Sequence, residues 1–225
     1  MENIRREVRL TSLEVLKKGL VQATAGNCSA RVTNHNIIAI TPNGMDYNDL
    51  KDEDIVLTDF SGTVFDGERE PSIELPMHLA IYKCREDVSA IIHTHSVFAS
   101  TMAVAGKQIP LVIDELMVYV GGEIELAQYA LPGSGQLAEN ALKALSERNA
   151  VLLQNHGMVG VGRDSKSALF CCEIVEKAAM ITVFASLLGK VETIPSDALE
   201  VEKTWFEKNK ENTKKHTNQE GGKRC

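Results

Sequence analysis

Two histidines separated by one residue close a short apolar run, and a third histidine follows another apolar run far downstream. The pair is His93 and His95, after the apolar residues 90–92, and the third is His156, after residues 151–153. Alternate residues of a strand point to the same side, so one strand can direct both members of the pair at one point. We therefore expect a fold in which the end of a second strand brings the third imidazole to that point.

Three imidazoles in this arrangement predict a divalent metal site, with Glu74 as the candidate fourth ligand. Nitrogen and carboxylate ligands suit Zn²⁺ best, and less often Mn²⁺, Co²⁺ or Fe²⁺. A structural zinc site would favour cysteine, but the five cysteines of the chain have no CxxC spacing, which also argues against a disulfide framework. The isolated histidines His35, His78 and His216 are better explained as hydrogen-bonded core or surface residues.

The net charge of the chain and the distribution of its apolar residues limit the possible classes of function. A net charge of −7 argues against a nucleic-acid binder, because such proteins need a surplus of Lys and Arg. Small molecules or proteins remain as the candidate binding partners. The first residues are charged where a signal peptide needs an apolar run, and no segment approaches the ~18 apolar residues of a membrane span. We therefore expect a cytoplasmic protein with no membrane partner.

The hydrophobic pattern alternates between hairpins and helices. A helix is expected near the start, with paired strands over 28–41 and 54–65, a helix over 72–84 capped by Ser72, and strands over 90–95, 111–120, 150–154 and 158–161. A helix or turn is expected near 97–105, and helices after Ser134 and over 165–188. Such interleaving predicts an α/β sandwich with much antiparallel pairing rather than a doubly wound sheet. Residues 1–207 form one predicted domain, and the polar residues 208–225 a mobile tail.

Five short motifs occur in the order and approximate spacing of a known family. They are Thr24-Ala25-Gly26-Asn27, Thr41-Pro42-Asn43-Gly44, Pro71-Ser72-Ile73-Glu74, His93-Thr94-His95 and Asn155-His156-Gly157. Together they resemble the class II aldolase and epimerase family, and most nearly its L-fuculose-1-phosphate aldolases, over about residues 3 to 192. The five motifs are specific as a set, although any one alone would be weak.

The resemblance implies an α/β fold, a three-layer α/β/α sandwich around a central, mainly antiparallel sheet. It implies a homotetramer with active sites at the subunit interfaces and one Zn²⁺ per subunit, held by Glu74, His93, His95 and His156. It also implies that the substrate phosphate is bound by Thr24, Asn27, Asn43, Gly44 and Ser72. Hydroxyl and amide groups, glycine N–H groups and a helix N-terminus can together bind a phosphate dianion.

The chain departs from the aldolases at several positions. Asn43 and Ile73 stand where these enzymes often carry hydroxyl residues, and the tyrosines that they use as acids are not evident. The segment 113–116 instead resembles the one in which methylthioribulose-1-phosphate dehydratases carry a catalytic glutamate. We therefore expect Glu115 to transfer the proton, with Asp114 as the alternative.

The expected reaction is zinc-dependent retro-aldol cleavage of a ketose 1-phosphate, such as L-fuculose 1-phosphate, into dihydroxyacetone phosphate and a short aldehyde. The catalytic residues would be Glu74, as ligand and base, and Glu115. Dehydration of a methylthioribulose-1-phosphate type of substrate, or 4-epimerisation of a related sugar phosphate, is the alternative. A non-enzymatic role like that of the adducin head domains is disfavoured, because those domains lack the metal ligands.

Overall fold

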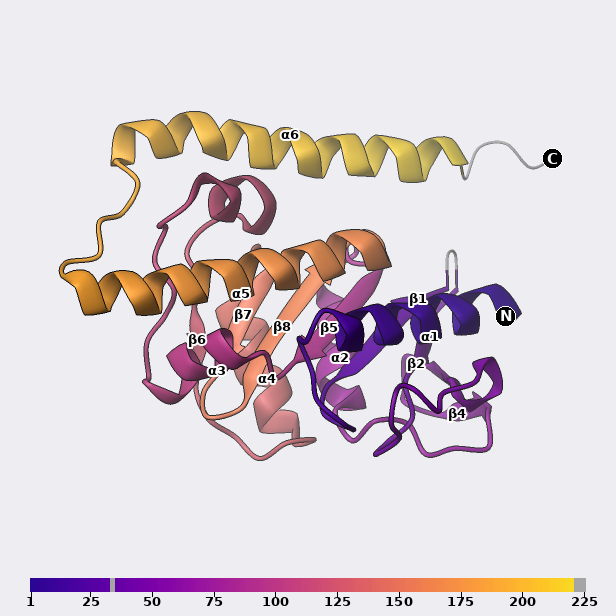
Figure 1. Ribbon diagram of the computed structural model, residues 1–225. Helices are drawn as coiled ribbons and strands as arrows, with labels where there is room; N and C mark the ends of the chain where they lie inside the picture. The colour runs from indigo at the N-terminus through magenta and orange to yellow at the C-terminus, as the bar shows by residue number, and fades with distance from the viewer. Residues whose placement is uncertain (33–34, 221–225) are drawn as a thin grey trace.

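The computed structural model describes residues 1–32 and 35–220, with side chains up to residue 208. The described residues form one eight-stranded sheet in the order β4-β3-β2-β1-β5-β8-β7-β6 (Figure 1). The strands are β1 (Asn27–Arg31), β2 (Ile37–Ile40), β3 (Val56–Asp59), β4 (Val64–Asp66), β5 (Ala90–Thr94), β6 (Leu126–Ala127), β7 (Ala150–Leu153) and β8 (Gly157–Gly162). The helices are α1 (Glu2–Lys17), the short η1 (Asp52–Asp54), α2 (Leu75–Cys84), α3 (Val97–Val104), the π-helix η2 (Leu116–Val120), α4 (Gly135–Leu145), α5 (Ser165–Leu188) and α6 (Ser196–Glu220).

The predicted α/β class is confirmed, but the prediction of a mainly antiparallel sheet needs a correction, because the sheet is mixed. Strand β6 pairs in parallel with β7, whereas the other pairings between described strands are antiparallel. Two parallel neighbours need a crossover connection, and α4 supplies it between β6 and β7. The sequence pattern predicted this helix but not β6, since a two-residue strand carries no alternation of its own.

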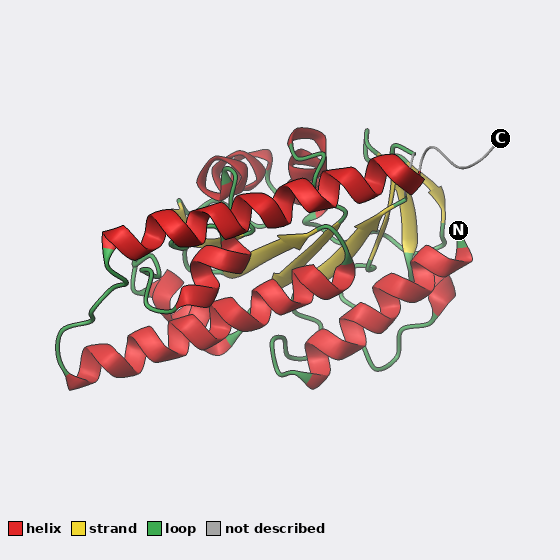
Figure 2. Ribbon diagram, turned by 90° about the horizontal axis from the view of Figure 1, so that it is seen from above, coloured by secondary structure: helices red, strands yellow, loops and turns green. Residues whose placement is uncertain are grey.

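Alternate residues of the central strand β5 enter different cores. Ala90 and Ile92 belong to the core under α1, α3 and α5, whereas Ile91 belongs to the core under α2 and α4. Figure 2 shows helices on both sides of the sheet. Because β5 is apolar on both faces, it is buried in the middle of the molecule, and the polar residues at its end lie in the interior too.

The segment 111–120, predicted as a strand, is instead irregular and ends in the π-helix η2. Its buried residues are Leu116, Met117 and Val120, a helical spacing rather than an alternation. A short apolar run fits both a strand and a buried helical turn, so the sequence alone could not decide between them.

Helix α6 lies across the top of the molecule and packs against η2 (Figure 1). It continues through residue 207, so the predicted domain boundary does not coincide with a break in secondary structure. The predicted mobility of residues 208–225 stays a prediction, because most of their side chains, and residues 221–225 altogether, lie outside the described part. No helix in the described residues is both long and apolar enough to cross a membrane.

Candidate metal centre

The sheet brings the three histidines together from two neighbouring strands. His93 lies on β5, His95 follows directly after its end, and His156 lies in the tight turn between β7 and β8. Strands β5 and β8 are antiparallel neighbours, with Thr94 opposite Met158. The turn that precedes β8 therefore lies beside the end of β5, as the spacing of the histidines predicts.

The three imidazole rings surround one point. Their centroids are 4.7–4.9 Å apart in every pair, with interplanar angles of 66–74°. The Nδ1–H of His93 donates to the carbonyl of Met158, so its Nε2 carries a lone pair, and this atom lies 2.9 Å from Nε2 of His95. One ligand nitrogen from each ring lies within 4.8 Å of the other two.

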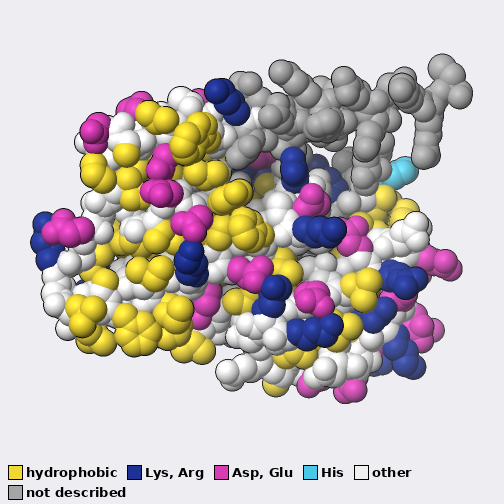
Figure 3. Space-filling view, turned by 45° about the horizontal axis from the view of Figure 1, so that its top comes forward, with side chains coloured by type: hydrophobic (Ala, Val, Ile, Leu, Met, Phe, Trp, Pro, Cys, Tyr) yellow, Lys and Arg dark blue, Asp and Glu magenta, His cyan; other side chains and the backbone are white. Residues whose placement is uncertain are grey.

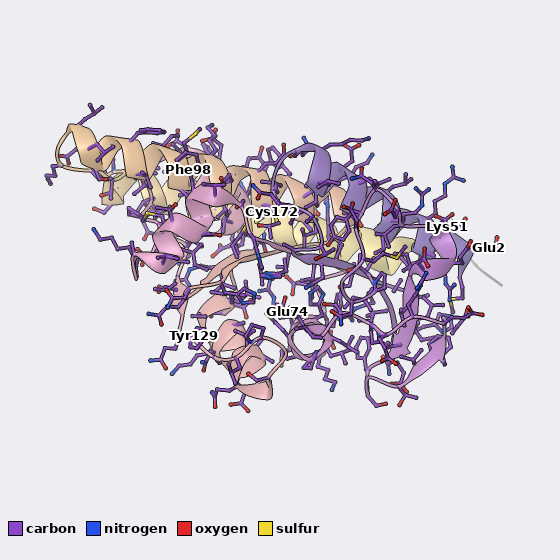
Figure 4. The ribbon with its side chains drawn as sticks, turned by 60° about the horizontal axis from the view of Figure 1, so that its bottom comes forward. Glu2, Lys51, Glu74, Phe98, Tyr129 and Cys172 are labelled. Atoms are coloured by element: carbon purple, nitrogen blue, oxygen red, sulfur yellow. The ribbon has the colours of Figure 1, made fainter. Side chains whose placement is uncertain are left out.

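Glu74 completes the cluster from the N-terminus of α2. Its Oε2 lies 3.1 Å from Nε2 of His93, and its Oε1 lies 3.4 Å from Nε2 of His156. Figure 4 shows Glu74 in the interior of the molecule. Glu74 itself, rather than Ser72, stands at the N-cap position of α2, while the hydroxyl of Ser72 accepts a hydrogen bond from the N–H of Glu74.

Two buried polar atoms of the cluster lack a hydrogen-bond partner among the described residues, Oε1 of Glu74 and Nδ1 of His156. A buried carboxylate oxygen without a partner is costly, and a cation between Glu74 and the imidazoles would compensate it. Tetrahedral zinc, with bonds of about 2.0–2.1 Å, separates its ligands by roughly 3.3–3.5 Å. The distances of 3.1 and 3.4 Å from Glu74 to His93 and His156 are close to this separation. The residues therefore fit a divalent metal ion.

The protonation states agree with this fit. Burial lowers the pKa of His93 to about 4 and also lowers the pKa of His95, so both rings are neutral at pH 7 and their lone pairs are free for a metal. Burial alone would raise the pKa of Glu74. However, electrostatic attraction between the carboxylate and the imidazoles of His93 and His156, together with a hydrogen bond from Asn27, holds that pKa below its ordinary value.

Two loops beside Glu74 carry most of the residues that were expected to bind phosphate. The backbone N–H of Asn43 donates to the carbonyl of Glu70, and the N–H of Ser72 donates to the carbonyl of Thr41. These bonds join the loop of Asn43 and Gly44 to the loop of Ser72. Gly44 has a φ of +66° and no neighbour within 4 Å of where a Cβ would stand, so its backbone is open to a ligand.

The other two expected phosphate residues lie before and at the start of β1. Thr24 is exposed in the turn before the strand. Asn27 is only 3 % exposed, and its Nδ2 donates to Oε2 of Glu74 at 2.8 Å. The side-chain amide of Asn27 therefore contacts a residue of the candidate metal site directly. The sequence did not reveal this contact.

Two glycines of the motifs are required by the close approach of their backbones to β5. A Cβ on Gly26 would stand 2.6 Å from the carbonyl oxygen of His93, and one on Gly157 would stand 2.2 Å from that of Thr94. Neither position tolerates a side chain without moving the strand that carries His93. Both glycines belong to motifs that were recognised in the sequence, but the sequence did not show which backbone segment they approach.

Glu115 does not join this cluster within the single chain. It directly precedes η2 and forms an ion pair of 2.7 Å with Lys177 of α5, which lowers its pKa through a hydrogen bond and through charge. Its neighbour Asp114 faces Glu202 of α6. Burial and the charge of Asp114 together raise the pKa of Glu202.

Comparison with known proteins agrees with the motifs. Residues 6–183 match the family described as Class II Aldolase and Adducin N-terminal domain. A 5-deoxy-D-ribulose 1-phosphate aldolase from Bacillus thuringiensis is 36 % identical over 89 % of this chain and 93 % of its own length. The L-fuculose phosphate aldolase of Escherichia coli K12 is 33 % identical over 84 % of this chain and 86 % of its own length.

A solved structure of an L-fuculose 1-phosphate aldolase superposes on this fold with a TM-score of 0.88 and 34 % sequence identity. The superposition covers 91 % of this chain and 96 % of that one. The match therefore extends over nearly the whole of both folds. The chain belongs to the family of class II aldolases and adducin N-terminal domains, and its aldolase relatives identify it as a lyase.

Proposed function

We propose that the protein cleaves a ketose 1-phosphate by a retro-aldol reaction into dihydroxyacetone phosphate and a short aldehyde. The observation that carries this proposal is the cluster of three convergent imidazoles and a buried carboxylate beside two joined, open loops. Two relatives named for ketose 1-phosphates, 5-deoxy-D-ribulose 1-phosphate and L-fuculose phosphate, support this class of substrate. Both names describe deoxy sugars, so the released aldehyde would end in a methyl group.

The difficult step is the build-up of negative charge on the three-carbon fragment as the carbon–carbon bond breaks. His93, His95, His156 and Glu74 would hold a divalent cation, for which we propose Zn²⁺ because of the imidazole-rich ligand set. The bound cation supplies Lewis-acid stabilisation of that charge. Glu74 is close enough to the cluster to act as a ligand at rest and as a base once substrate displaces it.

We propose that the phosphate group binds at Thr24, Asn27, Asn43, Gly44 and Ser72. Ser72 stands three residues before the first residue of α2, where the N–H groups of the first turn favour an anion, and the open backbone of Gly44 adds a further N–H. Binding there would hold the substrate with its reacting carbons toward the histidines. Orientation of this kind is worth several kcal/mol of the reaction barrier.

Glu115 is proposed to exchange a proton with the departing aldehyde in the active site of a neighbouring subunit, because in its own chain it contacts Lys177 instead. A homotetramer is the proposed assembly. Several large apolar side chains on η2, α5 and α6 are exposed, and Figure 3 shows hydrophobic side chains gathered on the part of the surface that includes the start of α6. They include Tyr119, Phe170, Phe184, Val201 and Trp205. Contiguous apolar surface of this kind is typical of subunit contacts.

Dehydration of a related sugar phosphate is the second candidate, because two acidic residues, Asp114 and Glu115, stand directly before η2. The two reactions give different products from similar substrates. The metal centre and the loops would serve either reaction, so products must distinguish them.

The test is incubation of the metal-loaded protein with a panel of ketose 1-phosphates that includes 5-deoxy-D-ribulose and L-fuculose 1-phosphates. Dihydroxyacetone phosphate is measured by coupled NADH oxidation, and the other product by NMR. We expect dihydroxyacetone phosphate and aldehyde in equal amounts, and no product from a His95→Ala control. Consumption of a ketose 1-phosphate without dihydroxyacetone phosphate, to an epimer or a dehydrated diketone, would overturn the proposal.

A further inference from the structure

Glu74 stands at one end of a buried ladder of polar side chains between α2 and β1. On the helix side, Glu74, His78 and Tyr82 follow one another at intervals of four residues, and on the strand side Asn27 and Ser29 are alternate residues. Four residues of a helix advance about 6 Å and two residues of a strand about 6.6 Å, so the two rows stay in register. Each strand residue thus lies between two helix residues.

The hydrogen bonds run without a gap along this ladder. Nδ2 of Asn27 donates to Glu74 at 2.8 Å, and Oδ1 of Asn27 lies 2.6 Å from Nε2 of His78. Nδ1 of His78 lies 2.6 Å from the hydroxyl of Ser29, which lies 2.9 Å from the hydroxyl of Tyr82. All five residues are at most 4 % exposed, so water cannot replace these bonds.

The chemistry of the end groups fixes the direction of every bond. A carboxylate only accepts, so Asn27 must turn its N–H₂ toward Glu74 and its carbonyl oxygen toward His78. Nε2 of His78 must then donate. Burial lowers the pKa of His78 to about 3, so the ring is neutral and its Nδ1 accepts from Ser29, which in turn accepts from Tyr82.

The two oxygens of the Glu74 carboxylate have different surroundings. Oε2 is held by Asn27, whereas Oε1 has no hydrogen bond among the described residues and faces His156. If His78 did not donate to Asn27, the amide could rotate by half a turn and set its oxygen against Glu74. Two acceptors would then repel each other, and the carboxylate would lose its orientation.

We propose that His78 is a positioning residue: by donating to Asn27 it fixes the orientation of Glu74 and thereby the affinity and geometry of the metal centre. This inference rests on the proposed function of the cluster as a metal site. A purely structural role of His78 in the core is the competing explanation. Partners outside the direct ligands commonly change metal affinity by 10–100-fold.

Two substitutions of His78 each retain the hydrogen bond of only one of the two ring nitrogens. The amide of His78→Gln can reach the place of Nε2 and donate to Asn27, whereas the amide of His78→Asn reaches only the place of Nδ1 and the contact with Ser29. Both variants remove one buried hydrogen bond, so both should lose stability to a similar degree. Tyr82→Phe, at the far end of the ladder, controls for loss of a buried hydroxyl.

The measurements are Zn²⁺ affinity by competition with a chromophoric chelator, the visible spectrum of the Co²⁺-loaded protein, and thermal unfolding without metal. We expect His78→Asn to weaken Zn²⁺ binding about 10-fold or more and to alter the Co²⁺ spectrum, and His78→Gln and Tyr82→Phe to stay within about threefold of the parent. Equal metal affinity in the parent and both His78 variants, or equal loss in both, overturns the positioning role while leaving the proposed metal site standing. Failure of the parent itself to bind Zn²⁺ or Co²⁺ overturns the metal site as well.

Discussion

Replacing Gly157 with alanine should separate the two strands that carry the metal histidines. Gly157 opens β8 directly after His156, opposite the end of β5. Its φ does not lie in the left-handed region, so an alanine there suffers no conformational strain. The cost arises entirely from the space that the new methyl group would need.

The magnitude follows from the distances around that methyl group. It would stand 2.2 Å from the carbonyl oxygen of Thr94 and 3.0 Å from Cδ2 of His95, whereas real Cβ atoms essentially never approach within 3.0 Å of another heavy atom. Because the nearest atom is backbone, β5 and β8 must part. Overpacking of this kind costs about 1–3 kcal/mol, and a weakened ladder hydrogen bond adds about 1 kcal/mol. A loss of about 2–4 kcal/mol lowers the midpoint of thermal unfolding by about 5–12 °C.

The assay is thermal unfolding with and without Zn²⁺, together with Zn²⁺ affinity, for Gly157→Ala and for Gly135→Ala as the matched control. Gly135 is the first residue of α4 and has no heavy atom within 4 Å of its Cβ position. Its replacement should be neutral or stabilise the helix by up to about 1 kcal/mol. Gly157→Ala should also weaken Zn²⁺ binding about 10-fold or more, because His95 must move. A melting midpoint within 2 °C of the parent and an unchanged Zn²⁺ affinity would refute this reasoning.

Three further predictions concern single side chains. His156→Ala should weaken Zn²⁺ binding and lower the rate at least about 100-fold, because it removes a ligand and its geometry; full zinc occupancy at a near-normal rate would exclude His156 from the site. Glu115→Gln should keep its zinc and change stability by less than about 0.5 kcal/mol, since the ion pair that it loses is exposed, yet lower the maximal rate by about 10²–10⁴-fold. A Glu115→Gln enzyme that keeps a third of its rate would point to Asp114 instead. The pKa of Glu202 is raised by burial and by Asp114, so its contribution to stability is present at low pH and lost as pH rises through that raised pKa. Glu202→Gln should therefore melt about 2–4 °C above the parent at neutral pH but not near pH 4, and a difference that does not vary with pH would contradict this.

The site could be predicted from the sequence wherever it depended on local spacing. His93 and His95 are two residues apart next to an apolar run, and strand geometry alone turns both toward one point. His156 follows a second apolar run, and the pairing of β5 with β8 brings it to the same point. These predictions needed only a period of two and the burial of apolar strands.

The contacts that the sequence did not reveal join elements that lie side by side in the fold but are separate in the chain. The sequence favours a hydrogen-bonded core or surface residue at His78. The side chain is buried and hydrogen-bonded, but its link to Glu74 through Asn27 depends on α2 lying over β1. The four-residue interval from Glu74 to His78 was the available signal. Strand β6 and the π-helix η2 were missed for a related reason, because partners elsewhere in the chain define them more than their own residues do.

The central claim is that a divalent metal held by the three histidines and Glu74 drives aldol cleavage. The most direct measurement is the rate of dihydroxyacetone phosphate release from a ketose 1-phosphate after removal of metal with a chelator, followed by titration with Zn²⁺. We predict that the rate falls at least about 100-fold on removal and returns in proportion to added metal, up to one equivalent per chain. An undiminished rate in protein shown to be free of metal would contradict the account.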